Sequence, residues 1–503
     1  MKSTVCFRRR GWHTGLLSCA ALVVGLAAAG AEVLAQQPSQ GQKLANAAQH
    51  KDMNLVGLND LQGRSAYQPI IHEQNSRWIA YIGHHGGSAL NPMTGVVEKN
   101  GTSIVDVTNP AHPVYLKHIP GPSGLGEAGG AQMVRMCPGS VLPHGLSGNF
   151  YLLRATASAH EIWNVTNPAN PSLAKTVVSN LKNTHKSWWE CETGIAYLVS
   201  DGTGLASATP SFPNWRTTRM TQIFDLSNPA APVFIRNYGL DGQQPGSSGA
   251  IPTGVHGPIS LGNRVYFGHG TGSNGILQIV DRAKLLGTGC SFNPTSPTAA
   301  DLLCPQLGRL DTSPTMGAHT VFPLLQQPVP DFAASPNKVR DFIVLTNEAG
   351  GNRCSDNRQM VYIVDITTPS KPMGIANYHV PAASGDFCAR GGRFGSHSSN
   401  ESFTSVFYGK LMFASWFNAG VRAIDIREPF SPTEVGFFIP ATTAKTDPRP
   451  EGCKLGVDAV CDVVIQTNNV EVDGRGLIYI VDRANTGLHI LELSGDARKI
   501  IEP

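Results

Sequence analysis

Four histidines stand at corresponding places in the chain, each at the start of a short apolar strand. They lie roughly 60–80 residues apart, as equivalent residues of successive repeats do. They are His185, His256, His319 and His397. Neutral imidazole binds zinc, copper and iron, so one histidine from each of four converging repeats indicates a transition-metal site. The alternative is that the four rings fill the centre of the fold and bond to loop backbone.

Two carboxylates follow the predicted ligands along their strands. Glu190 comes after His185, and Glu401 comes after His397. We expect them to accept hydrogen bonds from the imidazole N–H groups that face away from the metal, because such outer partners fix the orientation of a ligand.

A further set of residues lies where the second strand of each repeat is predicted to end. In an antiparallel blade these ends share a face with the starts of the first strands. The set is therefore expected to surround the mouth of the site, as further ligands, proton shuttles or substrate-binding charges. It comprises His84, His85, His269, Arg154, Asp201, Glu348 and Arg483. For each of them a place in a turn or a solvated loop is the alternative.

The predicted ligand set contains imidazoles and no carboxylate. This favours copper or iron over zinc, since catalytic zinc sites usually keep three protein ligands and a water. The sequence contains no nucleophile elbow, phosphate-binding loop, HExxH motif or c-type haem motif. Redox chemistry on a small molecule is the function class that remains for an enzyme.

A repeated pattern must position these residues. An apolar strand ends in an acidic or amide residue, and a turn with two prolines follows, as in residues 103–113, 161–171 and 222–232. The side chain of Asp or Asn can cap that turn, and proline stops ladder pairing. Seven copies occur, with their acidic or amide residues at Asp106, Asn164, Asp225, Asp281, Asp365, Asp425 and Glu492. The copy at Asp281 lacks the prolines, and the last copy, at Glu492, is degenerate. A period of roughly 60 residues fits four short strands and their turns, which is one propeller blade.

The Ile-Val-Asp-Val core followed by Asn-Pro-x-x-Pro resembles the LVIVD-repeat β-propeller family, and the resemblance extends over essentially the whole mature chain. It implies an exported or surface propeller and no assigned catalytic residues. The axial histidines are also similar, in arrangement only, to those of propeller metalloenzymes such as carotenoid oxygenases and selenium-binding methanethiol oxidases. The seven copies predict an all-β, seven-bladed β-propeller.

A closed propeller must hide its edge strands. The last repeat ends near Leu493 and lacks an outer strand, whereas residues 53–58 resemble the outer strand at residues 433–438. We therefore expect the N-terminal strand to close the ring. The predicted organisation is a signal peptide (1–35), a flexible leader (36–52) and a single propeller domain (53–503).

The N-terminus has the features of a signal peptide. Basic residues precede an apolar run, Leu16–Ala29, which is short for a membrane span, and cleavage is predicted after Ala35. Residues 16–19 also resemble a lipoprotein box, which leaves lipidation as an alternative. We expect an exported, periplasmic or secreted protein with no integral membrane segment after cleavage.

Charge and cysteine content agree with the predicted export from the cytoplasm. The chain has 39 basic and 36 acidic residues, and removing residues 1–35 leaves equal numbers of both. This balance argues against nucleic acid or anionic membrane as a partner. Ten cysteines occur, two of them before residue 35, and the even remainder suggests disulfides. The nearest-neighbour pairs are Cys137–Cys191, Cys290–Cys304, Cys354–Cys388 and Cys453–Cys461.

Two functions remain open from the sequence. The first is a copper- or iron-dependent oxidoreductase that acts on a small molecule at the four histidines. The second is a non-catalytic propeller that uses the same face to bind a protein or a carbohydrate. The fold alone does not choose between them.

Overall fold

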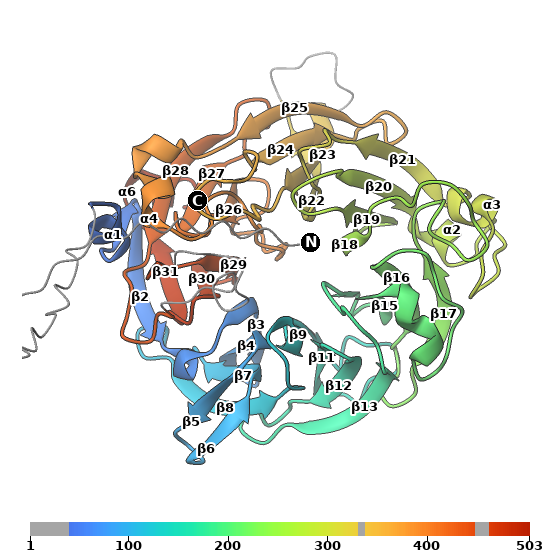
Figure 1. Cartoon of the computed structure of the whole chain (residues 1–503), viewed down its shortest axis with the longest axis horizontal. Coiled ribbons are helices and arrows are strands. Elements are labelled where there is room, and N and C mark those ends of the chain that lie inside the picture. Colours follow the sequence, from blue (N-terminus) through green and yellow to red (C-terminus); the bar gives the residue numbers. More distant parts are fainter. Residues whose placement is uncertain (1–39, 330–337, 448–461, 503) are drawn as a thin grey trace, which may run out of the picture. The chain divides into compact units, whose positions relative to one another are not determined.

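The strands form seven antiparallel sheets of four or five strands, and within each sheet nearly all neighbours are consecutive in the sequence. The computed structural model describes residues 40–329, 338–447 and 462–502. Figure 1 shows the sheets following one another around a ring, with their outermost strands at the perimeter. The predicted seven-bladed β-propeller is confirmed.

Each blade runs from an inner strand outwards. The inner strands are β3 (Ala66–Gln74), β10 (Met133–Pro138), β14 (Trp188–Trp189), β18 (Val255–Leu261), β22 (Thr320–Pro328) and β29 (Thr467–Val472). In the sixth blade, a single bridge between Ser399 and Ala414 takes the place of an inner strand. The second strands are β4 (Arg77–Gly86), β11 (Phe150–Thr156), β15 (Ile195–Ser200), β19 (Arg264–His269), β23 (Val339–Thr346), β26 (Leu411–Ser415) and β30 (Leu477–Asp482).

The third and outer strands complete the blades. The third strands are β7 (Gly101–Asp106), β12 (Ala159–Asn164), β16 (Met220–Asp225), β20 (Ile276–Asp281), β24 (Val361–Asp365), β27 (Val421–Asp425) and β31 (Leu488–Leu493). The outer strands are β8 (Val114–Pro120), β13 (Ser172–Ser179), β17 (Val233–Tyr238), β21 (Gln306–Asp311), β25 (Met373–Tyr378), β28 (Thr433–Ile439) and β2 (Met53–Asn59).

Short elements decorate the blades. The additional strands are β1 (Gln49–Lys51), β5 (Ser88–Asn91), β6 (Val96–Lys99) and β9 (Gly126–Ala131). The helices are α1 (Gln40–Ala45), α2 (Arg282–Leu285), α3 (Ala299–Leu303), α4 (Phe387–Arg390) and α6 (Gly495–Lys499), with 3-10 turns η1 (Leu61–Gly63), η2 (Gly202–Ser207) and η4 (Ala382–Ser384). The long gap between two repeat signatures is accounted for in part by α2, α3 and the loops around them, which lie between β20 and β21.

The repeat signature forms the third strand of each blade, as predicted. Its acidic or amide residue closes the turn that follows: the Asp106 carboxylate accepts the Thr108 N–H at 2.9 Å, and the Asp225 carboxylate accepts the Ser227 N–H at 2.8 Å. Asp365 makes the same contact with the Thr367 N–H at 2.9 Å. This local side-chain bond competes with further ladder pairing and ends the strand.

The N-terminal segment pairs with two blades. Strand β2 lies antiparallel to β31, with Met53 opposite Leu493, and is the outer strand of the last blade. Residues 40–51, expected to belong to a flexible leader, instead form α1 and β1, and β1 pairs with β28. The prediction missed this because three residues of strand leave no clear alternation in the sequence.

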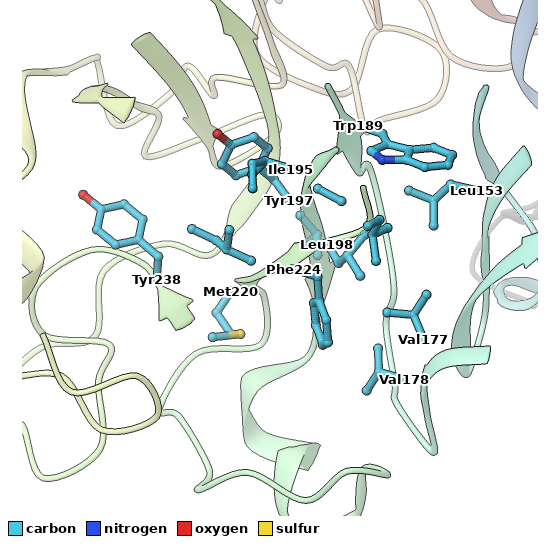
Figure 2. Packing of buried hydrophobic residues seen from close by; sticks show 14 of the residues in the cluster. Leu153, Val177, Val178, Trp189, Ile195, Tyr197, Leu198, Met220, Phe224 and Tyr238 are labelled. Carbon is cyan, nitrogen blue, oxygen red and sulfur yellow. The ribbon is translucent and has the colours of Figure 1, made fainter. Parts of the chain in front are cut away.

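The core lies between adjacent blades. Figure 2 shows Leu153 of β11, Val178 of β13 and Phe224 of β16 within one such cluster, together with Trp189 and Tyr197. Every residue of β15 is buried, while five residues at the start of β13 are exposed. A second strand is covered on both faces by neighbouring sheets, so the middle of its sequence is apolar, whereas an outer strand is not.

Three of the four predicted disulfides are present. Cys137–Cys191, Cys290–Cys304 and Cys354–Cys388 have Cα separations of 5.3, 5.9 and 5.3 Å. The Cys453–Cys461 pair and the predicted signal peptide lie outside the described residues. Within the described part of the chain, none of the helices is long and apolar enough to cross a membrane.

Candidate metal centre

The four predicted histidines lie where the innermost segments of four successive blades begin: His256 is in β18, and the other three come one to three residues before the first paired residues of their blades. The backbone N–H of His185 donates to the Val199 carbonyl at 3.1 Å, and that of His319 donates to the Thr346 carbonyl at 3.0 Å. His397 bonds in the same way to the end of β26, and His256 lies in β18 at a register shift. The ladder to the second strand therefore fixes where each imidazole stands, and all four are at most 2% exposed.

The four rings form a row in chain order. The centroid of His185 lies 4.5 Å from that of His256, His256 stacks on His319 at 3.6 Å, and His319 lies 4.5 Å from His397. Tyr67 of β3 is close to both end members of the row. Its ring centroid lies 5.7 Å from that of His185 and 5.7 Å from that of His397. The structure thus brings together every histidine that the sequence proposed as a ligand.

A carboxylate joins the end of this row. The Nε2 atom of His397 lies 3.7 Å from Glu348 Oε1, and Nε2 of His319 lies 3.9 Å from Glu348 Oε2. The potential ligand atoms of these three residues all lie within 4.8 Å of one another. Two ligand atoms about 2.0–2.2 Å from one ion are at most about 4.4 Å apart, and the two distances from imidazole to carboxylate, 3.7 and 3.9 Å, lie within that limit. His319, His397 and Glu348 are therefore the residues of the described chain best placed to share an ion.

The donor set differs from the predicted one. The sequence led us to expect four imidazoles and no carboxylate, but Glu348 reaches the site from the loop after β23. Two imidazoles and one carboxylate are typical of non-haem iron enzymes, and the same set occurs in zinc hydrolases. His185 and His256 lie farther along the row, with their Nε2 atoms 2.8 Å apart.

Hydrogen bonds orient the two imidazoles of this set. His397 Nδ1 lies 2.6 Å from the Asn468 carbonyl, which only accepts, so Nδ1 carries the proton and Nε2 carries the lone pair. His319 Nδ1 lies 2.9 Å from the Thr320 hydroxyl, and its Nε2 has no hydrogen-bond partner among the described residues. Bonds of this kind from the far nitrogen are typical of metal-binding histidines. Both Nε2 atoms face Glu348.

The protonation states suit metal binding. Burial lowers the pKa of all four histidines well below 6.5, and nearby charges lower it further, chiefly Arg219 at His185 and Arg483 at His397. A buried imidazole that stays neutral at pH 7 keeps its lone pair for a metal. Burial raises the pKa of the Glu348 carboxyl, while Arg393 and Arg483 oppose that shift.

Two predicted mouth residues lie beside Tyr67. The edge of the His85 ring meets Tyr67 at a centroid distance of 4.9 Å, and Arg483 Nη2 lies 3.2 Å from His85 Nε2. The Tyr67 hydroxyl lies 3.4 Å from His185 Nε2. Burial and the Glu348 charge raise the pKa of that hydroxyl well above 10, so it remains protonated next to the histidines.

The two expected outer carboxylates lie elsewhere, which corrects the sequence prediction. Glu190 accepts hydrogen bonds from Arg282 at 2.7 Å and from the Tyr197 hydroxyl at 2.8 Å. Glu401 forms ion pairs with Arg135 and Lys186. A strand rises about 3.3 Å per residue, so carboxylates four or five residues beyond a histidine are far down the strand and cannot reach its ring.

Three of the four other predicted mouth residues also have structural partners away from the row. Arg154 pairs with Glu161 at 2.9 Å and lies over the Trp163 ring, and Asp201 caps η2. His84 Nε2 lies 2.7 Å from the Ser103 hydroxyl. His269 is buried with its ring centroid 6.5 Å from that of Phe267, and neither of its ring nitrogens has a hydrogen-bond partner among the described residues. They are part of the blades or their turns, as the alternative interpretation of each expected.

A buried ion cluster lies farther along the inner strands. Lys186 and Arg135 both pair with Glu401, and Lys186 also donates to the Thr320 hydroxyl at 3.1 Å. The stem of Lys186 crosses Gly257, where an added Cβ would lie 2.6 Å from its Cγ and Cδ atoms. The Thr320 hydroxyl connects this cluster to His319.

Glu471 belongs to the same cluster but is held mainly by backbone. Its carboxylate accepts the N–H groups of Val472 at 2.9 Å and Ser402 at 3.0 Å. Burial, together with the nearby Glu401 charge, raises the pKa of Glu471 to about 7. Burial therefore favours the protonated form of this residue well above the pH range in which a glutamate ordinarily titrates.

Glu471→Gln is expected to change the pH dependence of stability. In the wild type the folded protein binds more protons than the unfolded chain between the ordinary carboxyl pKa and about 7, so stability falls as pH rises through that window, by about 3 kcal/mol. The variant lacks this contribution and should gain relative to the wild type at pH 8 but not at pH 4. Urea unfolding of both proteins at the two pH values measures it, and equal differences at both would contradict the prediction.

Several residues at the site escaped the sequence prediction. Tyr67 and Asn468 begin inner strands without histidine, and Lys186 follows directly on His185. Their position at a strand start, in register with the histidines, is the signal that could have found them. Arg219 and Arg393 come from loops, which do not follow the strand repeat, so the sequence pattern could not place them near the histidines.

Comparison with known proteins found a family repeat and solved structures of low similarity. The LVIVD repeat model matches residues 96–118, which include β7. No curated protein sequence gave a significant match. The β-propeller domain of Cps50 (Swd1) from Myceliophteria thermophila is 8% identical with a TM-score of 0.44, and the match covers 88% of this chain and 99% of that one. A hypothetical selenium-binding protein from Sulfolobus tokodaii is 12% identical with a TM-score of 0.46, covering 86% and 92%. At these values neither structure bears on function.

The blades, their third-strand signatures and the matched repeat lead to one conclusion. The chain is a seven-bladed β-propeller that contains an LVIVD repeat.

Proposed function

We propose that this protein is an exported, metal-dependent oxidoreductase that acts on a small molecule at the inner ends of its blades. The observation that carries the proposal is the convergence of His319, His397 and Glu348 within 4.8 Å. His319 and Glu348 come from one blade, with Glu348 in the loop between β23 and β24, and His397 comes from the next blade. Burying lone pairs without a partner costs free energy. Two imidazoles and a carboxylate fit a divalent transition metal.

The donor set favours iron as the resident metal, and copper is the second choice. A bound iron or copper ion supplies one-electron chemistry. The chain itself contributes orientation and hydrogen bonds. The Asn468 carbonyl fixes the tautomer of His397, and the Thr320 hydroxyl orients the ring of His319. The Tyr67 hydroxyl, next to His185, stays protonated and can donate a hydrogen bond at the edge of the site.

The second candidate function is a binding propeller without catalysis. The stacking of His256 on His319 favours it, since stacked rings also pack well with no metal between them. The two candidates differ in one measurable property, which is tight binding of a metal ion at this site.

Metal titration tests the proposal. Protein purified with a chelator is titrated with Fe(II), Cu(II) and Zn(II), and bound metal is measured by mass spectrometry after gel filtration. We expect about one ion per chain for iron or copper, and a change of oxidation state on exposure to reductant and oxygen. A protein that retains none of the three metals would support the binding propeller instead.

A further inference from the structure

We propose that a cavity beside His256 binds a small oxyanion, a carboxylate, sulfonate or phosphate group, through the guanidinium of Arg219. The inference names the class of substrate for the proposed metal site, and calling the bound anion a substrate rests on the proposed function. The oxyanion site itself is defined by residues other than the proposed ligands.

The cavity has a volume of about 340 Å³, near the lower limit for small-molecule sites. Its lining is rich in hydroxyl groups and contains one cation and one of the four imidazoles. The residues used here are Thr218, Thr253, Thr271, Ser273, Arg219 and His256. Hydroxyl groups can donate hydrogen bonds to the oxygens of any oxyanion.

Arg219 has donors left for a ligand. Its Nη2 donates to Glu127 at 2.6 Å, while Nε and Nη1 donate no side-chain hydrogen bond to any other residue in the described ranges. Its side chain is 19% exposed. A guanidinium binds carboxylate, sulfonate or phosphate oxygens through two parallel N–H donors. In Arg219 the second Nη2 hydrogen and a neighbouring N–H can form such a pair while the first Nη2 hydrogen stays on Glu127.

His256 connects the cavity to the candidate metal centre. Its ring is 1% exposed, and its Nδ1 has no hydrogen-bond partner among the described residues. The His256 ring also stacks on the ring of His319, a proposed metal ligand, at a centroid distance of 3.6 Å. A ligand in the cavity would therefore lie one imidazole ring away from a proposed metal ligand.

The charges around the row favour an anion. Arg219, Arg483 and Lys186 act electrostatically on histidines of the row, and Arg393 pairs with Glu348 at 3.2 Å. Two carboxylates, Glu348 and Glu127, offset part of this charge, and Asp201 is bonded to Asn183 and Thr203. A divalent metal would add to the positive field, which raises the local concentration of anions.

Calorimetric titration with small probes tests the inference on the metal-loaded and the metal-free protein. The probes are acetate, methanesulfonate and inorganic phosphate, with acetamide as the neutral counterpart of acetate. We expect saturable binding of at least one oxyanion, with acetamide about tenfold weaker or worse, because hydrogen bonds to charged groups are the stronger ones. The preferred probe then identifies which of the three groups the substrate carries.

Three variants separate ligand binding from structure. Arg219→Gln should weaken the preferred anion about tenfold or more, and Arg219→Lys should lose less. Glu127→Gln should tighten binding, because it removes the competing carboxylate, whereas a purely structural Arg219–Glu127 pair would predict weaker binding or none. Arg427→Gln is the control: this exposed arginine pairs with its own neighbour Asp425, and its replacement should leave anion affinity unchanged.

The outcomes distinguish this inference from the proposed function. Equal binding of acetate and acetamide, or anion affinity that Arg219→Gln leaves unchanged, overturns the oxyanion site even if the protein binds iron. Arg219-dependent anion binding to a protein that takes up no metal supports the oxyanion site and contradicts the metal centre.

Discussion

Replacing His397 by alanine is expected to remove the bound metal from a protein that still folds. The variant loses one of three proposed ligands, and its neighbour Glu348 is left with one imidazole partner. Changes in the outer partners of metal ligands alone cost about 10–100-fold in affinity, so loss of a ligand should cost on the order of 100-fold or more. His319→Ala and Glu348→Gln should have effects of the same size, measured as metal content after dialysis.

The design includes a gradient of variants and a control. His256→Ala and His185→Ala remove rings that lie farther along the row and should reduce metal affinity less than His397→Ala. His72→Gln changes a half-buried histidine elsewhere on β3 and should leave metal content unchanged. Equal losses for His72→Gln and His397→Ala would mean that metal content reports on folding and not on the site.

The second large effect is expected at Lys186, which is buried in the ion cluster along the inner strands. Lys186→Met removes one of two cations that pair with Glu401, leaving that buried carboxylate with Arg135 alone. Removing one partner of a buried pair is strongly destabilising, by about 3–5 kcal/mol. We expect this loss in the free energy of unfolding by urea.

A compensating variant tests the cause. Lys186→Met combined with Glu401→Gln removes both charges and should recover part of the lost stability, since an uncharged cluster has no desolvated carboxylate. Lys499→Ala, which removes an exposed pair with Asp496, should show no measurable change. If Lys186→Met is as stable as the wild type, the cluster does not stabilise the inner strands.

The blades could be predicted from the sequence because their signals are local. Strand, turn and proline pair repeat along the chain, and each Asp or Asn closes its own turn two residues later, as at Asp106 and Asp225. The register of the four histidines followed from the same repeats. Their side chains meet because the inner strands of neighbouring blades start at one level, a consequence of topology alone.

The rest of the site depends on distances that the repeats do not encode. Glu348 and Asp201 follow the second strands of their blades, yet only Glu348 reaches the histidines, while Asp201 caps the turn next to it. The sequence prediction placed Glu190 and Glu401 too close to the histidine rings. Each residue of a strand adds about 3.3 Å of length, so four or five residues take the carboxylate out of reach. Arg219 reaches the cavity from a loop, and loop paths have no period to detect.

Anomalous scattering from a crystal of the metal-loaded protein is the most direct test of the central claim. Data collected on either side of the absorption edge of the bound metal locate the ion independently of the protein atoms. We predict a single strong peak between His319 Nε2, His397 Nε2 and the Glu348 carboxylate, about 2.0–2.2 Å from each. A peak bound elsewhere in the molecule, or none after metal loading, would contradict the proposed metal centre.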